Sequence, residues 1–216
     1  MNLLALEFSS SHRSVAVLEY EKDGRTAVLS FKSDADFRKV SGMVLIDGAL
    51  KEAKLRPEEV NKMAVGLGPG SYTGIRSAIA IAQGWQLARG IDLVGLSSIE
   101  VIAAGAKKQK INGEVTIIVD AQRKELYAAT YNLDSERPAV MESLRLIPVC
   151  PVPAAKRLVG PDAGKFVPGA TDLFPRADIL GEVALLVGVA TPGERLEPIY
   201  LRESSFVKAP VSRIVL

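Results

Sequence analysis

The N-terminal part of the chain alternates between short apolar runs and polar turns. Residues 3–8 and 15–20 are apolar runs on either side of a polar stretch, and a third run near residues 26–31 follows the Asp23–Gly24 turn. Apolar runs of this length, bounded by turn residues, are typical of β-strands joined as hairpins. The pattern therefore predicts three neighbouring strands at the start of the chain.

Farther along, the apolar residues change to helical spacing. Met43, Ile46, Leu50 and Ala53 recur every three or four positions, so the segment 41–55 is predicted to be an amphipathic helix that ends before the next proline. The elements expected after it are a strand at 61–66, a helix at 73–89, a strand at 91–96 and a helix at 99–107.

The second half of the chain repeats part of this pattern. A lysine cluster and the Asn112–Gly113 turn mark a boundary near residue 107. Two predicted strands at 114–120 and 125–131 then flank a polar turn, as in the N-terminal hairpin, which suggests an internal duplication.

We therefore expect two lobes. The N-terminal lobe is expected over residues 1–107, the smaller second lobe over 108–190, and a C-terminal segment, 191–216, is expected to pack back on the first lobe. The second lobe should contain short strands and loops between 138 and 175 and a helix at 179–190, and a strand or extended segment is expected at 198–202.

Composition supports an α/β core and restricts the classes of partner. Hydrophobic residues make up 48% of the chain and aromatic residues only 6%, so Leu, Ile, Val and Ala must build most of the core, as in sheets covered by helices. The formal net charge is only +2, which provides no basic stripe for autonomous nucleic-acid binding. Any contact with RNA is therefore expected to be shared with another protein.

Cysteine content and apolar run lengths predict a cytoplasmic location. Cys150 is the only cysteine, so neither an intrachain disulfide nor a cysteine-based zinc cluster can form, which fits a reducing compartment. Glu7, Ser9 and Ser10 interrupt the first apolar run too early for a signal peptide. No apolar stretch reaches the roughly 20 residues of a membrane span, and no contact with a membrane is expected.

The most distinctive local feature is the segment from Gly66 to Arg76, GLGPGSYTGIR, between a predicted strand and a predicted helix. Glycines allow positive φ and close backbone approach, and Ser71 or Thr73 can cap the helix. The same helix N-terminus could bind a phosphate through free N–H groups. The residue order matches neither a P-loop nor the Gly-x-Gly-x-x-Gly fingerprint, so a structural turn and a phosphate cradle are both open interpretations.

The helix predicted at 73–89 has almost no polar face. Ala80, Gly84 and Ala88 form a stripe of small residues, and larger apolar residues occupy other sides. A helix that is apolar nearly all round is buried on more than one side. It is therefore either a central helix of the monomer or a helix shared between its own sheet and a partner protein.

Two carboxylates are candidates for a site between the lobes. Glu7 is expected at the end of the first strand and Asp120 at the end of the first strand of the second hairpin. Carboxylates there could hold hydrated Mg²⁺ beside nucleotide phosphates, or cap turns. His12 is the only histidine, which excludes a zinc peptidase of the two-histidine kind and leaves a polar turn residue as its expected role.

The glycine loop and three shorter regions together resemble the TsaB family, also called YeaZ. The loop, followed by AQG at 82–84, is similar to the family signature Gly-Pro-Gly-Ser-Phe/Tyr-Thr-Gly-x-Arg. The shorter regions are LALEFSS at 4–10, VDAQR at 119–123 and PIYLR at 198–202. In the family the first strand usually ends in Asp followed by Thr or Ser, whereas Glu7 and Phe8 stand here.

The resemblance implies an α/β fold of the ASKHA type (actin/Hsp70-like, ribonuclease H-like), with two lobes of which the second is reduced. It implies a non-catalytic scaffold and activator of TsaD, the relative that transfers a threonylcarbamoyl group to N6 of adenosine 37 of tRNA. TsaE, an ATPase, would complete the assembly, and tRNA would be contacted only through the complex. No catalytic residue and no metal ligand is assigned to this chain.

By the same resemblance, the helices at 41–55 and 73–89 pair with TsaD or, in the isolated protein, with a second copy as a homodimer. The residues expected at this interface are Met43, Ile46, Leu50, Ile75, Ala78, Ile81, Ala82 and Trp85.

A nucleotide is the one cofactor that stays open. ATP or ADP with Mg²⁺ would lie at the interlobe or complex interface and involve Glu7, Ser9, Ser10, Gly68, Gly70, Ser71, Thr73 and Asp120. The alternative functions are an ATP-binding small-molecule kinase or ATPase of the ASKHA class and, last, a glycoprotease-like peptidase.

Overall fold

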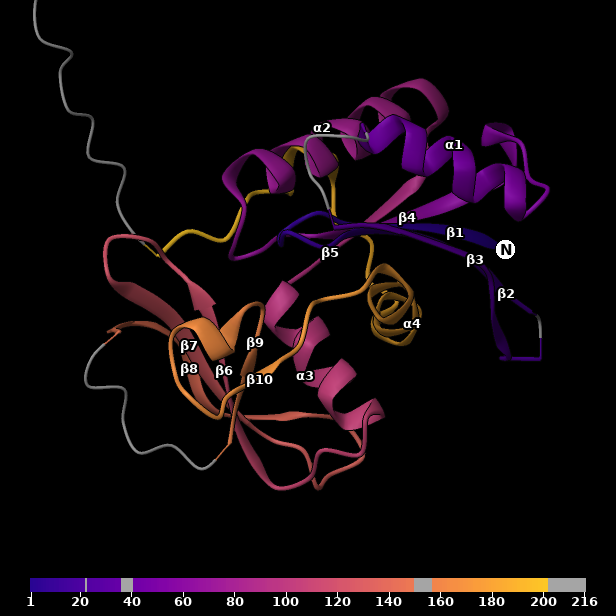
Figure 1. Ribbon diagram of the computed structural model, residues 1–216. Coiled ribbons are helices and arrows are strands. Elements are labelled where there is room, and N and C mark those ends of the chain that lie inside the picture. Colours follow the sequence, from indigo (N-terminus) through magenta and orange to yellow (C-terminus); the bar gives the residue numbers. More distant parts are fainter. Residues whose placement is uncertain (22, 36–40, 150–156, 202–216) are drawn as a thin grey trace, which may run out of the picture.

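Two five-stranded sheets form the framework of the computed structural model, which describes residues 1–21, 23–35, 41–149 and 157–201 (Figure 1). The first sheet has the order β3-β2-β1-β4-β5, and the second has the order β10-β9-β6-β7-β8. The strands of the first sheet are β1 (Asn2–Glu7), β2 (Arg13–Tyr20), β3 (Thr26–Asp34), β4 (Val60–Gly66) and β5 (Asp92–Leu96). Those of the second are β6 (Glu114–Asp120), β7 (Glu125–Asn132), β8 (Ala139–Pro148), β9 (Leu158–Gly160) and β10 (Thr171–Asp172).

The two sheets share one topology. In each, the first three strands along the chain pair antiparallel, the fourth pairs parallel with the first, and the fifth pairs parallel with the fourth. The duplication suggested by the two hairpins thus extends to whole sheets. The expected α/β class with two lobes is confirmed, and β9 and β10 have only three and two residues.

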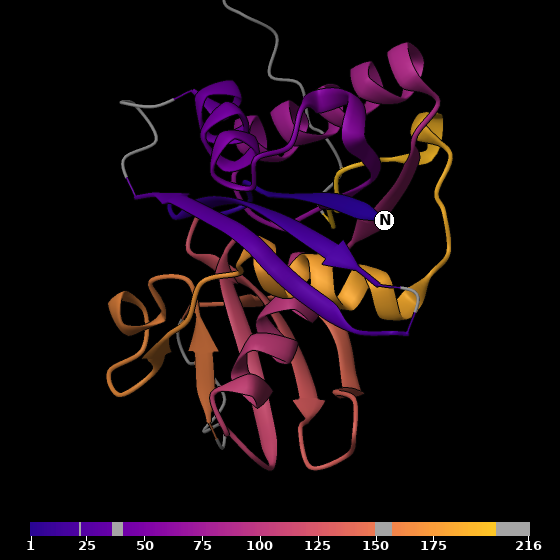
Figure 2. The same cartoon turned by 90° about the vertical axis from the view of Figure 1, so that its right-hand side faces the viewer.

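Helices cover both faces of the first sheet (Figures 1 and 2). The α-helices of the described residues are α1 (Gly42–Glu52), α2 (Tyr72–Arg89), α3 (Ser98–Lys108) and α4 (Ala177–Val187), each within three residues of its predicted position. Alternation along β1 explains the layers, because successive side chains of a strand point to opposite faces. Leu4 and Leu6 pack with α1 and α2, whereas Leu3 and Ala5 pack with α4.

Two helices pack on the sheet that is formed by the other half of the chain: α3, from the first half, packs on the second sheet, and α4, from the second half, packs on the first. α3 precedes the second sheet in sequence and packs Ile102 and Ala106 against it, beside Ile117. α4 follows the second sheet but packs Leu180 against the first, and its first amide, of Ala177, donates to Oγ of Ser14 in β2 (2.9 Å). The segment expected within the second lobe therefore contributes a helix to the first sheet.

The remaining segments are short. The 3₁₀ helices are η1 (Pro57–Glu59), η2 (Ala163–Lys165) and η3 (Gly193–Arg195). Around η2, Ala163 and Phe166 cover the outer face of the second sheet, where the first sheet has two long helices. β8 has 10 residues, so the expectation of only short strands after residue 138 is wrong.

The described part of the C-terminal segment lies against the first lobe. The amide of Thr191 donates to the carbonyl of Leu93 (2.7 Å), and the amide of Ile199 donates to that of Leu67 (2.9 Å). Because Ile199 bonds to a loop rather than to a strand, no strand forms at 198–201. Residue 202 and Cys150 lie outside the described residues.

Within the described stretches, none of the helices combines the length and the apolar character needed to cross a membrane.

Candidate functional site

The glycine loop between β4 and α2 packs directly on the backbone that follows β1. The amide of Ser71 donates to the carbonyl of Ser9 (2.7 Å), and a Cβ atom at Gly70 would lie 2.1 Å from the same oxygen. A Cβ atom at Gly74 would lie 2.0 Å from the carbonyl oxygen of Phe8. Since a carbonyl of the main chain cannot yield as a flexible side chain can, both positions require glycine.

Several N–H groups of this loop already have partners within the protein. Oγ of Ser71 caps α2 by accepting from the amide of Gly74 (3.3 Å). The amide of Gly68 donates to Oγ of Ser98 at the start of α3 (3.2 Å). These bonds attach the loop to β1 and α3, so that fewer of its amides are left to bind a phosphate.

The side chain of Glu7 is completely buried, which corrects the expectation that it faces a cleft between the lobes. Its carboxyl group accepts hydrogen bonds from the amide of Ser9 and from the hydroxyl of Ser98, both at 2.9 Å. Gly66 provides the space, since a Cβ atom there would lie 2.0 Å from the carboxyl oxygen. Glu7 therefore connects β1, β4 and α3 and lies out of reach of a ligand in the cleft.

Burial raises the pKa of the Glu7 carboxyl, because the charged form loses its water; the hydrogen bonds from Ser9 and Ser98 offset this only in part. The protonated form is thus favoured by folding. The contribution of this group to stability is fully present below the unfolded value near 4.5 and is lost as the pH rises through the folded value.

We predict that Glu7→Gln makes the protein more stable than the wild type at neutral and alkaline pH. Glutamine has the shape of the neutral acid and does not ionise, so the difference in unfolding free energy should be smallest near about pH 4 and grow with pH. Urea denaturation at several pH values measures it. Glu58→Gln, at an exposed position of η1, is the control, and a difference that does not change with pH would contradict the role of ionisation.

A cleft of about 490 Å³ lies between the lobes beside the glycine loop. Among the residues expected to bind a nucleotide, Ser9, Ser10, Gly70, Ser71 and Asp120 line it, whereas Glu7, Gly68 and Thr73 do not. Several lining residues of the second lobe were not predicted from the sequence, namely Gln122, Tyr127, Asp162, Lys165 and Phe166.

The internal duplication was the signal that could have revealed part of this missed set. Pro161 and Asp162 follow β9 in the second lobe as the glycine loop follows β4 in the first. A Cβ atom at Gly160 would lie 1.9 Å from the carbonyl oxygen of Ile118, so this loop also packs on the neighbouring strand. Equivalent loops of the two lobes therefore face each other across the cleft.

The side chain of Asp120 forms hydrogen bonds within the turn that follows β6. Its two carboxylate oxygens accept from the amide and from the side-chain amide of Gln122, both at 2.7 Å. The turn is left-handed without glycine, because Gln122, Arg123 and Lys124 have φ of 61°, 55° and 62°, a conformation that costs non-glycine residues free energy. Asp120 therefore acts as a turn cap.

The chemical character of the cleft follows from these bonds. Serine hydroxyls line one side, and on the other Lys165 and Asp162 form an ion pair (2.8 Å). Over the described ranges, no group of three or more His, Cys, Asp and Glu side chains is arranged to hold a metal ion. The cleft is suited to a polar ligand that hydrogen-bonds to hydroxyl groups.

A second candidate site is the outer surface of α1 and α2. A groove of about 340 Å³ runs between the two helices. It is lined in part by Met43 of α1 and by Ser77, Ala80 and Ile81 of α2. Large apolar side chains beside it are exposed: Met43 to 53%, Val44 to 60%, Tyr72 to 61% and Leu87 to 89%. This surface can bury apolar area against another protein.

Five residues expected at the partner interface are instead buried in the first lobe, which corrects that expectation. They are Ile46, Leu50, Ile75, Ala78 and Ala82. Their helical spacing marks the side of each helix that faces its own sheet. Met43 is exposed, and Ile81 and Trp85 are half-buried. Val44, Ala80 and Leu87 were missed, although they are the apolar residues left over once the buried stripes are assigned.

Arg76 belongs to a stacked group at the N-terminal end of α2. Its guanidinium carbon lies 4.4 Å from the ring centroid of Tyr72 and 5.8 Å from that of Tyr200. The two rings stack with their centroids 5.7 Å apart. Cation–π contacts of this kind hold the C-terminal segment against α2, and they place rigid tyrosine and arginine side chains at the edge of the outer surface.

Comparisons with known proteins identify the family. Residues 39–146 match the family model of TsaD, tRNA N6-adenosine threonylcarbamoyltransferase. The tRNA threonylcarbamoyladenosine biosynthesis protein TsaB of Escherichia coli is 30% identical over 176 residues, which cover 68% of this chain and 72% of that protein. The chain belongs to the TsaB family.

Further members of the TsaB family support this assignment. TsaB of Bacillus subtilis is 27% identical over 131 residues, which cover 61% of this chain and 55% of that protein. YeaZ from Pseudomonas aeruginosa superposes with a TM-score of 0.75 at 26% identity, covering 93% of this chain and 99% of that chain. The resemblance carried by the glycine loop is thus confirmed, and the TsaB-family fold extends over nearly the whole chain.

Proposed function

We propose that this TsaB-family protein takes part in the synthesis of threonylcarbamoyladenosine in tRNA as a non-catalytic partner subunit. It would be the scaffold and activator of TsaD, with TsaE joining the assembly and tRNA contacted only through the complex. The names of the Escherichia coli and Bacillus subtilis relatives connect those proteins with this modification. The observation that supports a partner role is the exposed apolar surface of α1 and α2.

The composition of this surface suits a helix-to-helix contact. Ala80 and Gly84 lie on the exposed side of α2, and small residues allow another helix to approach closely. Met43 and Leu87 supply apolar area beside them. In aqueous solution an apolar patch of this kind is normally covered by another protein surface. The isolated protein should therefore form a homodimer through the surface that binds TsaD in the complex.

The kinase or ATPase alternative is supported by the interlobe cleft alone. Serine hydroxyls line the cleft, but Glu7 is buried below it and Asp120 caps its own turn. Glu7 therefore cannot reach a hydrated Mg²⁺ beside ATP or ADP, and Asp120 would have to share carboxylate oxygens that already accept from Gln122. We therefore rank this function second.

Depletion of the gene in its host tests the proposal. Threonylcarbamoyladenosine in total tRNA should fall several-fold, measured by mass spectrometry of the digested nucleosides, and the wild-type gene supplied in trans should restore it. TsaD should co-purify with the tagged protein from the same cells. An unchanged level of the modified nucleoside in cells shown by immunoblot to lack the protein would refute the proposal.

A further inference from the structure

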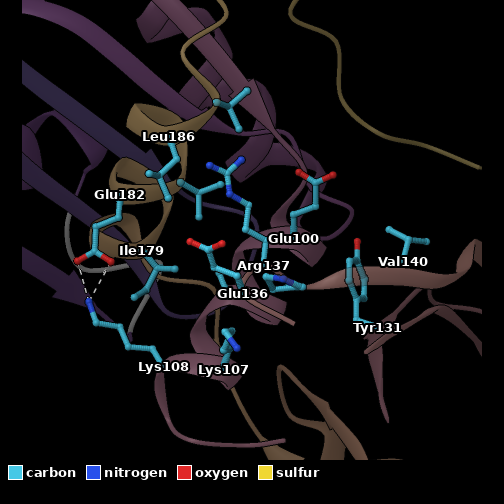
Figure 3. A pocket seen from close by; sticks show the side chains of 14 residues that line it. Glu100, Lys107, Lys108, Tyr131, Glu136, Arg137, Val140, Ile179, Glu182 and Leu186 are labelled. Carbon is cyan, nitrogen blue, oxygen red and sulfur yellow. Dashed lines mark hydrogen bonds and ion pairs between the residues drawn. The ribbon is translucent and has the colours of Figure 1, made fainter. Parts of the chain in front are cut away.

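A third pocket, of about 380 Å³, lies between α3, α4 and the β7–β8 hairpin and shares no lining residue with the interlobe cleft (Figure 3). Its apolar walls come mainly from α4 and from the start of β8: Pro138, Val140, Ile179, Val183, Leu186 and Val187. Leu186 is exposed to 64% and Val140 to 56%. An apolar hollow with exposed apolar rims is typical of a binding site.

The charged side chains around the pocket are only partly paired. Lys108 binds both carboxylate oxygens of Glu182, at 2.7 and 2.9 Å, as Figure 3 shows. Glu100 of α3 projects between the α4 wall and the strand wall, and it has no ion pair with a described residue. Glu136 and Arg137 at the rim bring one charge of each sign. Lys107 also lines the pocket, and its ammonium donates to the carbonyl of Leu133 (2.9 Å), so the lining carries three charges of each sign. Within this balance, the carboxylate of Glu100 is left for a cation of a ligand.

The surroundings of Glu100 make this charge significant. Partial burial raises the pKa of its carboxyl, although the residue as a whole is exposed. Tyr131 also lines the pocket, and burial, with a contribution from the charge of Glu100, raises the pKa of its hydroxyl to about 12. A carboxylate in apolar surroundings gains more from a neighbouring cation than one in water does.

The adjoining strand can hold an extended chain. β8 is the last strand of the second sheet, so one side of its backbone has no partner strand in the described part of the chain. Ala139, Val140 and Met141 are exposed and uncharged. Val140 lies opposite Tyr131 in the ladder with β7, and both line the pocket. A strand added to β8 would therefore direct alternate side chains over the pocket.

We propose that this pocket and the free edge of β8 bind an extended segment of another protein, in which an apolar side chain fills the pocket and a lysine or arginine two positions away pairs with Glu100. The apolar walls set the first requirement and the unpaired carboxylate sets the second. The site lies apart from the α1–α2 surface, so both surfaces can be occupied at once.

A peptide titration of the full-length ¹⁵N-labelled protein tests the proposal. The probe is a capped, threonine-rich peptide with leucine and arginine two positions apart, and the comparison peptide has glutamate in place of the arginine. The first peptide should shift the amide signals of Glu100, Val140 and Leu186. Its affinity should exceed that of the second by about tenfold, because a charge-assisted bond to a carboxylate is lost.

Protein variants locate the site. Glu100→Gln should lower the affinity for the first peptide by about tenfold and abolish the preference for arginine over glutamate. Leu186→Asp should abolish binding of both peptides. Val28→Asp is the matched control, because Val28 lies in β3, the corresponding edge strand of the first sheet, and is exposed to 43%.

Three results would overturn the proposal. They are equal affinity for the two peptides, amide shifts that map to another surface, and binding that occurs only after deletion of residues 202–216, which would identify the chain's own tail as the occupant. Because none of these measurements involves TsaD or tRNA, they are independent of the test of the proposed function.

Discussion

Gly74→Ala should destabilise the protein by about 2–4 kcal/mol, although alanine is normally the better residue inside a helix by about 1 kcal/mol. The added Cβ atom would lie 2.0 Å from the carbonyl oxygen of Phe8 and 3.1 Å from Oγ of Ser71. Relief of this overlap requires α2 to move away from β1, which would break the hydrogen bond from the amide of Ser71 to the carbonyl of Ser9. Urea denaturation monitored by circular dichroism measures the effect.

The same helix contains its own control. Gly84 is exposed, and a Cβ atom there meets nothing within 4 Å. Gly84→Ala should therefore stabilise the protein by about 0.5–1 kcal/mol through helix propensity alone. The two substitutions are chemically identical, so opposite signs can come only from the surroundings. Destabilisation of similar size at both positions would show that the contact of Gly74 with β1 is not what requires glycine.

Ala80→Arg should weaken the proposed association with TsaD, and the proposed homodimer, by about 100-fold or more. Ala80 lies in the groove between α1 and α2 at an exposed position. An arginine there would insert a long charged side chain into an apolar contact without a partner for its charge. Calorimetric titration with TsaD and sedimentation equilibrium of the isolated protein measure the two associations.

This variant should keep its fold, since surface substitutions usually change stability by less than about 0.5 kcal/mol. Ala190→Arg is the matched control: Ala190 is exposed and follows α4, which covers the opposite face of the first sheet. A folded Ala80→Arg protein that still binds TsaD with wild-type affinity would move the interface away from α2.

The helices and strands could be predicted well because each is marked by a pattern within its own residues. The stripe of Ile46 and Leu50 gave the position of α1, and the capping residue Ser71, confirmed as the N-cap, gave the start of α2. Short apolar runs bounded by polar turns gave β1 and β2. These signals lie within a few residues of the structure they describe, so no knowledge of the fold is needed to interpret them.

The site was less predictable because its geometry depends on contacts between distant residues. Glu7 is buried because Gly66 leaves space beside it and Ser98 donates to it, and neither residue is near it in sequence. Five of the eight predicted interface residues were misplaced for a related reason. A periodic apolar stripe shows which side of a helix is covered, but not whether its own sheet or a partner covers it, and for Ile75 and Ala82 the cover is its own core.

The exchange of α3 and α4 between the sheets has a consequence for folding. A cut near residue 110 would separate α4 from Leu3 and Leu18, which it covers, and α3 from the strands behind it. Neither fragment could then bury its apolar surface, so the halves should not fold when expressed separately. The intact molecule should instead lose both sheets in one thermal transition, with equal calorimetric and van't Hoff enthalpies.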